Sequence, residues 1–276
     1  MIKYDLTQLE TRGYAIIPNF ISTEKVLECQ SLYNSLELSD DNKNYTLKKS
    51  NNPIITEVLD LLKEINLQTS MLTNAVNNRV LYFDNNLINF GWHQDHETYF
   101  RYQDSYHSLN LWIPIIKPEL DTSGLKVVPY DSLNSKIPFV TETQIRGKGA
   151  KRFGIQSDST TKMYDDENGT ETILPLSLDD ICEIPDVGPG DLILMREDTI
   201  HMTQTITNHR VAMSVRCINY NTIITAEKLY SGSSLKKSMI NNNRSSYLDL
   251  INALNSTPSV VASEAIEKFN ENFTCL

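Results

Sequence analysis

The residues with the clearest capacity for chemistry are His93 and Asp95, which flank Gln94 in the run Gly91–Tyr99. Side chains two positions apart in an extended segment point to the same side, with backbones ~6–7 Å apart. An imidazole and a carboxylate placed in this way can converge on one divalent cation. The pattern is short enough to arise by chance, so it indicates a metal site only together with a third ligand.

His201 is the candidate third ligand. It lies downstream of the turn Gly188–Gly190 and of the strand-like run that starts at Asp191. A tight turn, a strand and a short loop would carry a second strand with His201 back toward the first pair. Two histidines and one carboxylate on one face form the facial triad of non-haem iron(II) oxygenases, which leaves adjacent positions open for a bidentate oxoacid and O₂. Zinc is the competing ion, since the same ligands suit it.

Thr203 and Arg210 are candidates to bind the far end of such an oxoacid. Thr203 lies two residues after His201, so the two side chains would share one face of a strand. A hairpin that turns near residues 206–207 would place Arg210 opposite Thr203. A guanidinium and a hydroxyl suit a carboxylate. Arg216 has the same parity as Arg210 but lies ~20 Å further along its strand. We therefore expect Arg210, rather than Arg216, to bind the oxoacid.

Three more residues are candidates for lining a substrate pocket, and each also has a plainer interpretation. Gln94 could hydrogen-bond a substrate or merely the surrounding loop. Tyr99 could line the pocket or pack in the interior, and Trp112 could form a platform for the substrate or belong to the core.

Other polar residues favour structural roles. His96 has the opposite parity to Asp95, so we expect it to lie outside the ligand set. The acidic run 165–168 lacks the alternating ligands of a calcium loop and is predicted to be a solvated turn. The cysteines show no paired spacing, which favours reduced thiols in a cytoplasmic protein. They are Cys29, Cys182, Cys217 and Cys275.

The composition is that of a globular protein with a core. The chain has 276 residues, of which 40% are hydrophobic and 22% charged, and its formal net charge is −10. This charge repels phosphate backbones, so nucleic acid is not an expected partner. No apolar run approaches the ~18 residues that would span a bilayer, and the first residues carry charges throughout. A small-molecule substrate is the expected partner.

The elements that must position these residues are expected to form one domain over residues 1–276. Residues 1–77 are predicted to be mainly helical support, and residues 224–276 to be helical again. Residues 78–223 contain short strand-like runs separated by turns, which predicts an antiparallel sandwich or barrel core. A mixed stretch at about 133–186 reads as an insertion and could be a lid.

The motifs, taken in order, resemble the phytanoyl-CoA dioxygenase-like branch of the iron(II)/2-oxoglutarate oxygenases. The run His93–Tyr99 is particularly similar to ectoine hydroxylases, and the resemblance covers roughly Gly13 to Asn221, with Ser132–Asp186 poorly matched. The motifs that carry it are His93-Gln94-Asp95, SLNLWIPI, Ser123–Pro129, GPGDLILM, His201-Met202-Thr203 and Arg210.

This resemblance implies a mainly β fold with flanking helices around a double-stranded β-helix (jelly-roll, cupin-like) core. It implies iron(II) bound by His93, Asp95 and His201, and 2-oxoglutarate bound by Thr203 and Arg210, with Asn110 on an inward position near the co-substrate. It also implies oxidative decarboxylation of 2-oxoglutarate by O₂ to succinate and CO₂.

Two departures from the family pattern concern the co-substrate side. The interval from His201 to Arg210 is shorter than in many members, and Pro129-Tyr-Asp-Ser132 replaces the usual Pro-Gly-Ser-His run. Related halogenases have a small residue in place of the metal carboxylate, so the presence of Asp95 favours hydroxylation.

The leading hypothesis is therefore an iron(II)/2-oxoglutarate-dependent dioxygenase that hydroxylates a C–H of a small metabolite. The alternatives are a cupin-like metal-dependent hydrolase or isomerase, and a non-catalytic β-sandwich binding module. Desaturation, cyclisation and epimerisation use the same oxidant, and the sequence does not distinguish them from hydroxylation.

Overall fold

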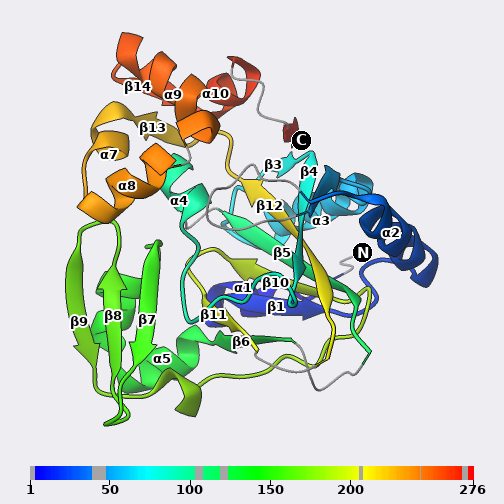
Figure 1. Ribbon diagram of the computed structural model, residues 1–276, viewed down its shortest axis with the longest axis horizontal. Helices are drawn as coiled ribbons and strands as arrows, with labels where there is room; N and C mark the ends of the chain where they lie inside the picture. The colour runs from blue at the N-terminus through cyan, green and yellow to red at the C-terminus, as the bar shows by residue number, and fades with distance from the viewer. Residues whose placement is uncertain are drawn as a thin grey trace.

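The main antiparallel sheet forms the centre of the protein, as the computed structural model shows (Figure 1). The structure describes residues 4–38, 48–102, 108–118, 124–204, 208–242, 244–268 and 273–276. In spatial order the sheet contains β1 (Tyr14–Ile17), β10 (Leu192–Arg196), β5 (Leu109–Ile116), β12 (Val211–Ile218), β3 (Ala75–Asn77) and β15 (Phe273–Cys275). It is extended by β4 (Arg79–Asp84), which pairs with β12, and by β2 (Lys48–Asn51), which pairs with β4.

A second antiparallel layer faces this sheet and is continuous through a single residue, His93. Isolated bridges join His93 to His201 on one side and to Arg152 on the other. The layer contains β6 (Leu125–Val128), β11 (Ile200–Thr203), β7 (Lys151–Ile155), β8 (Thr161–Asp165) and β9 (Thr170–Leu174). The two layers form a jelly-roll core, which confirms the predicted fold class.

Helices flank the sheets and close the ends of the core. They are α1 (Thr7–Arg12), α2 (Thr23–Ser35), α3 (Ile55–Gln68), α4 (Glu97–Tyr102), α5 (Tyr130–Lys136), α6 (Pro138–Val140), α7 (Ala226–Tyr230), α8 (Ser234–Asn242), α9 (Arg244–Ser256) and α10 (Ala262–Lys268). A π-helical turn (Thr141–Ile145), a 3₁₀ turn (Leu178–Asp180) and the pair β13 (Ile223–Thr225) and β14 (Ser259–Val261) complete the described elements. No described helix is long and apolar enough to cross a membrane.

Alternation along the main sheet separates a helix-facing core from a site-facing interior. Residues such as Leu111, Met213 and Leu194 are buried against α2 and α3 in the largest hydrophobic cluster. Their neighbours Trp112, Ala212 and Ile193 face the second layer, because successive side chains of a strand point to opposite faces. In Figure 1, α2 and α3 lie on one side of the main sheet and β7–β9 on the other.

The N-terminal segment is only partly helical, unlike the prediction for residues 1–77. Strand β1 pairs with β10, and β3 pairs with β12, so this segment contributes strands to the main sheet as well as the helices that cover it. These strands are three or four residues long, too short to produce a clear alternation in the sequence. The stretch 133–186 is folded, and its strands β7, β8 and β9 extend the second layer.

The acidic run 165–168 lies in a turn, but Asp166 and Glu167 are buried, so the prediction that this turn is solvated is wrong for these two residues. Asp165 pairs with Lys151, Asp166 with Arg152, and Glu167 with Lys236, whose side chain is fully buried in α8. Ser233 also donates a hydrogen bond to the Asp166 carbonyl oxygen. Three consecutive acids therefore bind cations from two elements, and connect the β7–β9 sheet to the C-terminal helices.

Removal of one charge from this junction is expected to destabilise the protein. The Lys236 Nζ lies 2.6 Å from Glu167 Oε1, and its burial leaves no water to replace that partner. Breaking a buried pair typically costs about 3 kcal/mol or more. We expect Glu167→Gln to lower the free energy of unfolding by about that amount in urea denaturation. Asp179→Asn, at the exposed Asp179–Lys126 pair, is the matched control; an equal loss in both variants would contradict the assignment.

Candidate metal centre

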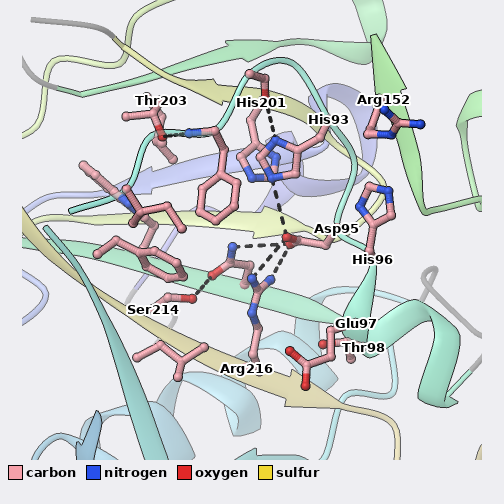
Figure 2. Close-up of a pocket in the computed structure, with 18 of the residues that line it drawn as sticks. His93, Asp95, His96, Glu97, Thr98, Arg152, His201, Thr203, Ser214 and Arg216 are labelled. Atoms are coloured by element: carbon pink, nitrogen blue, oxygen red, sulfur yellow. Dashed lines mark hydrogen bonds and ion pairs between the residues drawn. The ribbon is translucent and has the colours of Figure 1, made fainter. Parts of the chain in front are cut away.

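His93, Asp95 and His201 meet at one point between the two layers, although they come from distant parts of the chain (Figure 2). One potential ligand atom from each residue lies within 4.8 Å of the others. His93 and His201 exchange backbone hydrogen bonds, each 3.0 Å long, and their ring centroids are 4.3 Å apart. The second layer therefore fixes the spacing of the two imidazoles through its backbone.

Backbone carbonyl groups determine which ring nitrogen of each histidine faces the centre. Nδ1 of His93 lies 2.8 Å from the Gly91 carbonyl oxygen, and Nδ1 of His201 lies 3.0 Å from that of Thr199. A carbonyl oxygen only accepts, so each Nδ1 carries the proton and each Nε2 keeps its lone pair. The Nε2 of His93 lies 4.0 Å from Asp95 Oδ1. Both rings are thus held in the tautomer that a metal ion requires.

The Asp95 carboxylate is held from the main sheet by Arg216 and Asn110. Both guanidinium nitrogens of Arg216 donate to it, Nη2 at 3.1 Å from Oδ1 and Nη1 to Oδ2. Asn110 Nδ2 lies 3.4 Å from Oδ2, and Ser214 Oγ donates to Asn110 Oδ1 at 2.8 Å. Figure 2 shows this chain of contacts running from the sheet to the carboxylate.

These charges determine the protonation of the centre. Burial alone would raise the pKa of Asp95, but the charge and hydrogen bonds of Arg216 outweigh it and hold the pKa well below its usual range. Burial lowers the pKa of His93 to about 3, with the neighbouring His201 as a further cause. Burial also lowers the pKa of His201. At neutral pH the centre therefore presents one carboxylate and two neutral imidazoles.

A second buried carboxyl group, Glu197, lies beside this centre. Its side chain is fully buried, and its Oε1 is 3.7 Å from Nη1 of Arg216. Burial raises the pKa of Glu197 to about 8 despite the nearby arginine. Arg216 therefore faces one ionised carboxylate, Asp95, and one carboxyl group that retains its proton near neutral pH.

Thr203 and Arg210 lie in the same cavity as the triad, but not for the reason expected from the sequence. The predicted hairpin is wrong, because β11 pairs with β6 and β12 pairs with β5, β4 and β3. Thr203 belongs to β11 of the second layer, and Arg210 directly precedes β12 of the main sheet; both line the cavity. Thr203 Oγ1 accepts a hydrogen bond from the Phe90 backbone N–H.

Arg210 is a buried cation with unused hydrogen-bonding capacity. It is 1% exposed, its Cζ lies 5.5 Å from the centroid of the Trp112 ring, and its Nε has no hydrogen-bond partner among the described residues. Burial lowers the pKa of Arg210 to about 10, so it stays charged at neutral pH. A buried guanidinium without a full set of partners is costly, and an anionic ligand would complete it.

The three candidates for the substrate pocket have different positions. Trp112 lines the cavity. Gln94 does not: it is fully buried, and its Nε2 donates to the carbonyl oxygens of Ile145 and Asp198. Tyr99 packs with Phe100 and Ala150 instead of lining the cavity. For Gln94 and Tyr99 the plainer interpretation is therefore the one that the structure supports.

Two polar groups at the cavity were missed or left open by the sequence. Asp166 binds Arg152 through two hydrogen bonds and also His96 Nε2, at 2.9 Å, so His96 is directed away from the ligand set as expected. Arg216 was set aside in favour of Arg210, yet it contacts a metal-ligand candidate directly. Because alternate residues of a strand share a face, Arg216 lies on the same face of β12 as Ser214. The sequence alone does not show that this face turns toward the metal centre, because that depends on the pairing of β12 with β5.

Comparison with known proteins finds distant structural likenesses to solved structures, among them SnoK, EvdO2 and HygX. No protein-family model and no curated protein sequence matches this chain. The non-haem, alpha-ketoglutarate-dependent carbocyclase SnoK from nogalamycin biosynthesis is 14% identical, with 80% of this chain and 85% of that chain covered and a TM-score of 0.49. EvdO2 from Micromonospora carbonacea var. aurantiaca is 12% identical, with coverages of 79% and 91% and a TM-score of 0.48.

HygX from Streptomyces hygroscopicus, whose structure has nickel and 2-oxoglutarate bound, is also 12% identical. The match covers 79% of this chain and 87% of HygX, with a TM-score of 0.46. Likenesses this distant carry no argument about chemistry.

The lowered pKa values of the histidines predict a metal affinity that is nearly independent of pH. Two ordinary histidines, with pKa values of about 6.5, would each bind a competing proton as the pH falls from 8 to 6. His93 stays neutral over this range because burial lowers its pKa to about 3, and burial shifts the pKa of His201 in the same direction. We expect the nickel(II) dissociation constant, measured by calorimetry, to change less than about threefold. A weakening of about tenfold or more would show that the rings titrate normally.

Proposed function

We propose that this protein is an iron(II)- and 2-oxoglutarate-dependent oxygenase. One observation carries the proposal: a triad of two imidazoles and one carboxylate shares a cavity with a buried arginine whose Nε has no hydrogen-bond partner among the described residues. The triad supplies ligands suited to iron(II) and leaves coordination positions open. The arginine supplies the cation that the distal carboxylate of an oxoacid needs.

The donor set fits the metal. Iron(II) would be held by Nε2 of His93, Nε2 of His201 and the Asp95 carboxylate, since each Nδ1 is engaged by a backbone carbonyl group. Arg216 and Asn110 orient the carboxylate. Outer partners of this kind typically alter metal affinity or activity by 10–100-fold. When bound, iron and 2-oxoglutarate supply the oxidative chemistry, with O₂ consumed and succinate and CO₂ released.

The residues of the chain bind and orient the reactants and exclude water. Arg210 and Thr203 would bind the distal carboxylate of 2-oxoglutarate, and Asn110 would contact the co-substrate near the metal. Phe90 and Trp112 line the same part of the cavity, and their apolar surfaces exclude water from the charged groups. In this low-dielectric environment the ion pair with Arg210 is stronger than it would be in solvent.

The proposal extends to the reaction and the substrate. Hydroxylation of a C–H is favoured over halogenation because Asp95 occupies the position of the metal carboxylate. The motif order supports placement in the phytanoyl-CoA dioxygenase-like branch. The cavity has a volume of about 900 Å³, at the upper end of the range for sites that bind drug-sized molecules, so it has room for a small-molecule substrate beside the co-substrate.

The first test is anaerobic binding followed by turnover. Iron(II) and 2-oxoglutarate together are expected to give a visible charge-transfer band, and O₂ added with a substrate that accepts its second oxygen atom should then yield succinate. Asp95→Ala removes a metal ligand and should reduce succinate formation by roughly a hundredfold or more, equivalent to about 3 kcal/mol. Asp179→Asn, at an exposed acid on another surface, should retain wild-type formation.

The alternatives make distinct predictions in the same experiment. Metal-dependent turnover of a substrate without O₂ would support a hydrolase or isomerase. Failure to bind either iron or 2-oxoglutarate would support a binding module without catalysis.

The second test separates the two arginines. Arg210→Gln should weaken 2-oxoglutarate binding by roughly 10–150-fold, which corresponds to the 1.5–3 kcal/mol of a charged hydrogen bond. Nickel(II) affinity without 2-oxoglutarate should be unchanged, because within the described part of the chain Arg210 makes no hydrogen bond or ion pair with the triad. Arg216→Gln is the matched variant, and its primary effect should be on the metal. A larger loss of 2-oxoglutarate affinity in Arg216→Gln would reverse the assignment.

A further inference from the structure

The loop 85–90, which follows β4, contacts both residues that are proposed to bind the far end of the oxoacid. At its start, Asn85 hydrogen-bonds the backbone of Arg210. At its end, the Phe90 N–H donates to Thr203 Oγ1 at 3.2 Å, and the Phe90 carbonyl oxygen accepts from the Thr203 N–H at 2.9 Å. One short loop therefore connects the two sides of the proposed co-substrate site.

Arg210 depends on this loop because it lies just outside the main sheet. Strand β12 begins at Val211, one residue later. Val211 is opposite Asp84, the last residue of β4. Beyond that pair, the contact between the two segments continues through Asn85, so Asn85 takes the place of the next ladder position.

Three hydrogen bonds from Asn85 hold the segment that carries Arg210. The Asn85 N–H donates to the Arg210 carbonyl oxygen at 3.1 Å, and Asn85 Oδ1 accepts from the Arg210 N–H at 2.8 Å. Asn85 Nδ2 donates to the Asn208 carbonyl oxygen at 2.8 Å. An N–H only donates and a carbonyl oxygen only accepts, so the side-chain amide has one orientation. It bridges the two peptide groups on either side of His209.

The loop is itself fixed, so Asn85 has a defined position from which to act. The N–H groups of Leu87 and Ile88 donate to the Asp84 carbonyl oxygen at 2.9 and 3.0 Å. Asn89 Nδ2 donates to the Asn85 carbonyl oxygen at 3.0 Å. These bonds close a turn directly after β4, and the side chain of Asn85 extends from that turn to the neighbouring segment.

The direction of the Arg210 side chain follows from the position of its backbone. The side chain is 1% exposed, and its Cζ lies over the Trp112 ring. In such a buried setting it has little freedom to compensate for a displaced backbone. Hydrogen bonds between a guanidinium and a carboxylate depend on distance and direction, so a small displacement of Arg210 weakens them.

We propose that Asn85 is the positioning residue that aims Arg210 at the distal carboxylate of the co-substrate. This inference rests on the proposed function, in which Arg210 binds that carboxylate. Asn85 is not among the described residues that line the cavity, so it acts through Arg210 and does not itself bind the oxoacid. Its amide thereby determines how strongly the site prefers an oxoacid with a second carboxylate.

Two oxoacids that differ only in the distal group measure this preference. In 2-oxopentanoate a methyl group replaces the distal carboxylate of 2-oxoglutarate, and the 2-oxo acid end is the same. The dissociation constants of both are measured by calorimetry on the nickel(II)-loaded protein, and their ratio gives the preference. We expect the wild-type protein to bind 2-oxoglutarate at least about tenfold more tightly, because the charged hydrogen bonds of Arg210 act on that ligand alone.

Substitution of Asn85 should lower this preference and leave the metal site intact. Asn85→Ala should weaken 2-oxoglutarate binding at least about fivefold, while the affinities for 2-oxopentanoate and nickel(II) stay within about twofold, because misplacement of a binding group affects only the ligand that it contacts. Asn85→Ser, whose short side chain does not span both peptide groups, is the second variant and should shift the ratio in the same direction. Asn86→Ala, at the exposed neighbouring position, is the matched control and should keep the wild-type ratio.

A double-mutant cycle shows whether Asn85 acts through Arg210. In the Arg210→Gln background, Asn85→Ala should change 2-oxoglutarate binding by less than about twofold, because the group that Asn85 positions is gone. Fully additive effects of the two substitutions would mean that the residues act independently, and would overturn the inference.

The inference is also overturned if both Asn85 variants keep the wild-type ratio, or if they weaken both oxoacids equally, as a merely structural role would. Failure of the proposed function is a separate result, because the wild-type protein would then form no charge-transfer band with iron(II) and 2-oxoglutarate. If the wild-type protein forms the band and prefers 2-oxoglutarate, but the Asn85 variants retain that preference, only the role of Asn85 is disproved.

Discussion

The burial of the Asp95 carboxylate is the constraint on which the interior of this protein depends. A buried carboxylate is costly without a cation and hydrogen bonds. The main sheet supplies both, from Arg216 and Asn110, and the second layer supplies the two imidazoles on the opposite side. The interior between the layers therefore contains polar groups where an ordinary jelly roll would pack hydrophobic side chains.

The two layers contribute to the polar interior in different ways. The second layer fixes the histidines through backbone contacts, namely the His93–His201 bridge and the carbonyl groups that hold each Nδ1. The main sheet positions charged side chains, which determine the protonation of the centre and the kind of ligand that the cavity admits. The position of the imidazoles is thus a property of the backbone, whereas the electrostatics depend on individual side chains such as Arg216.

The sequence was informative where the decisive geometry is local. His93 and Asp95 share a face because they are two residues apart, and the Gly-Pro-Gly turn before β10 marks the strand that precedes His201. The alternating runs also predicted an antiparallel β core. The pairing of β11 with β6 rather than with β12 was not readable, because partner choice depends on which strands close the sandwich. The role of Arg216 could not be predicted for the same reason.

Burial was the other quantity that the sequence could not provide. The acidic run 165–168 has the composition of an exposed turn, but its partners Lys151, Arg152 and Lys236 come from elements placed around it by the fold. Gln94 lies between two ligands in the chain and points the opposite way from both. Its role as a support for the loop at Asp198 follows from alternation, once the strand-like conformation at His93 is known.

The bridge between His93 and His201 also bears on when the candidate metal site can form. The two residues belong to distant parts of the chain, and β1 and β10, which pair in the main sheet, are further apart still. Folds dominated by such non-local pairings have high contact order and fold slowly. The entropy cost of closing long loops comes before the contacts that stabilise them are made. His93 and His201 meet only after both strands have been synthesised and paired. The nascent chain therefore has no preformed version of this candidate site.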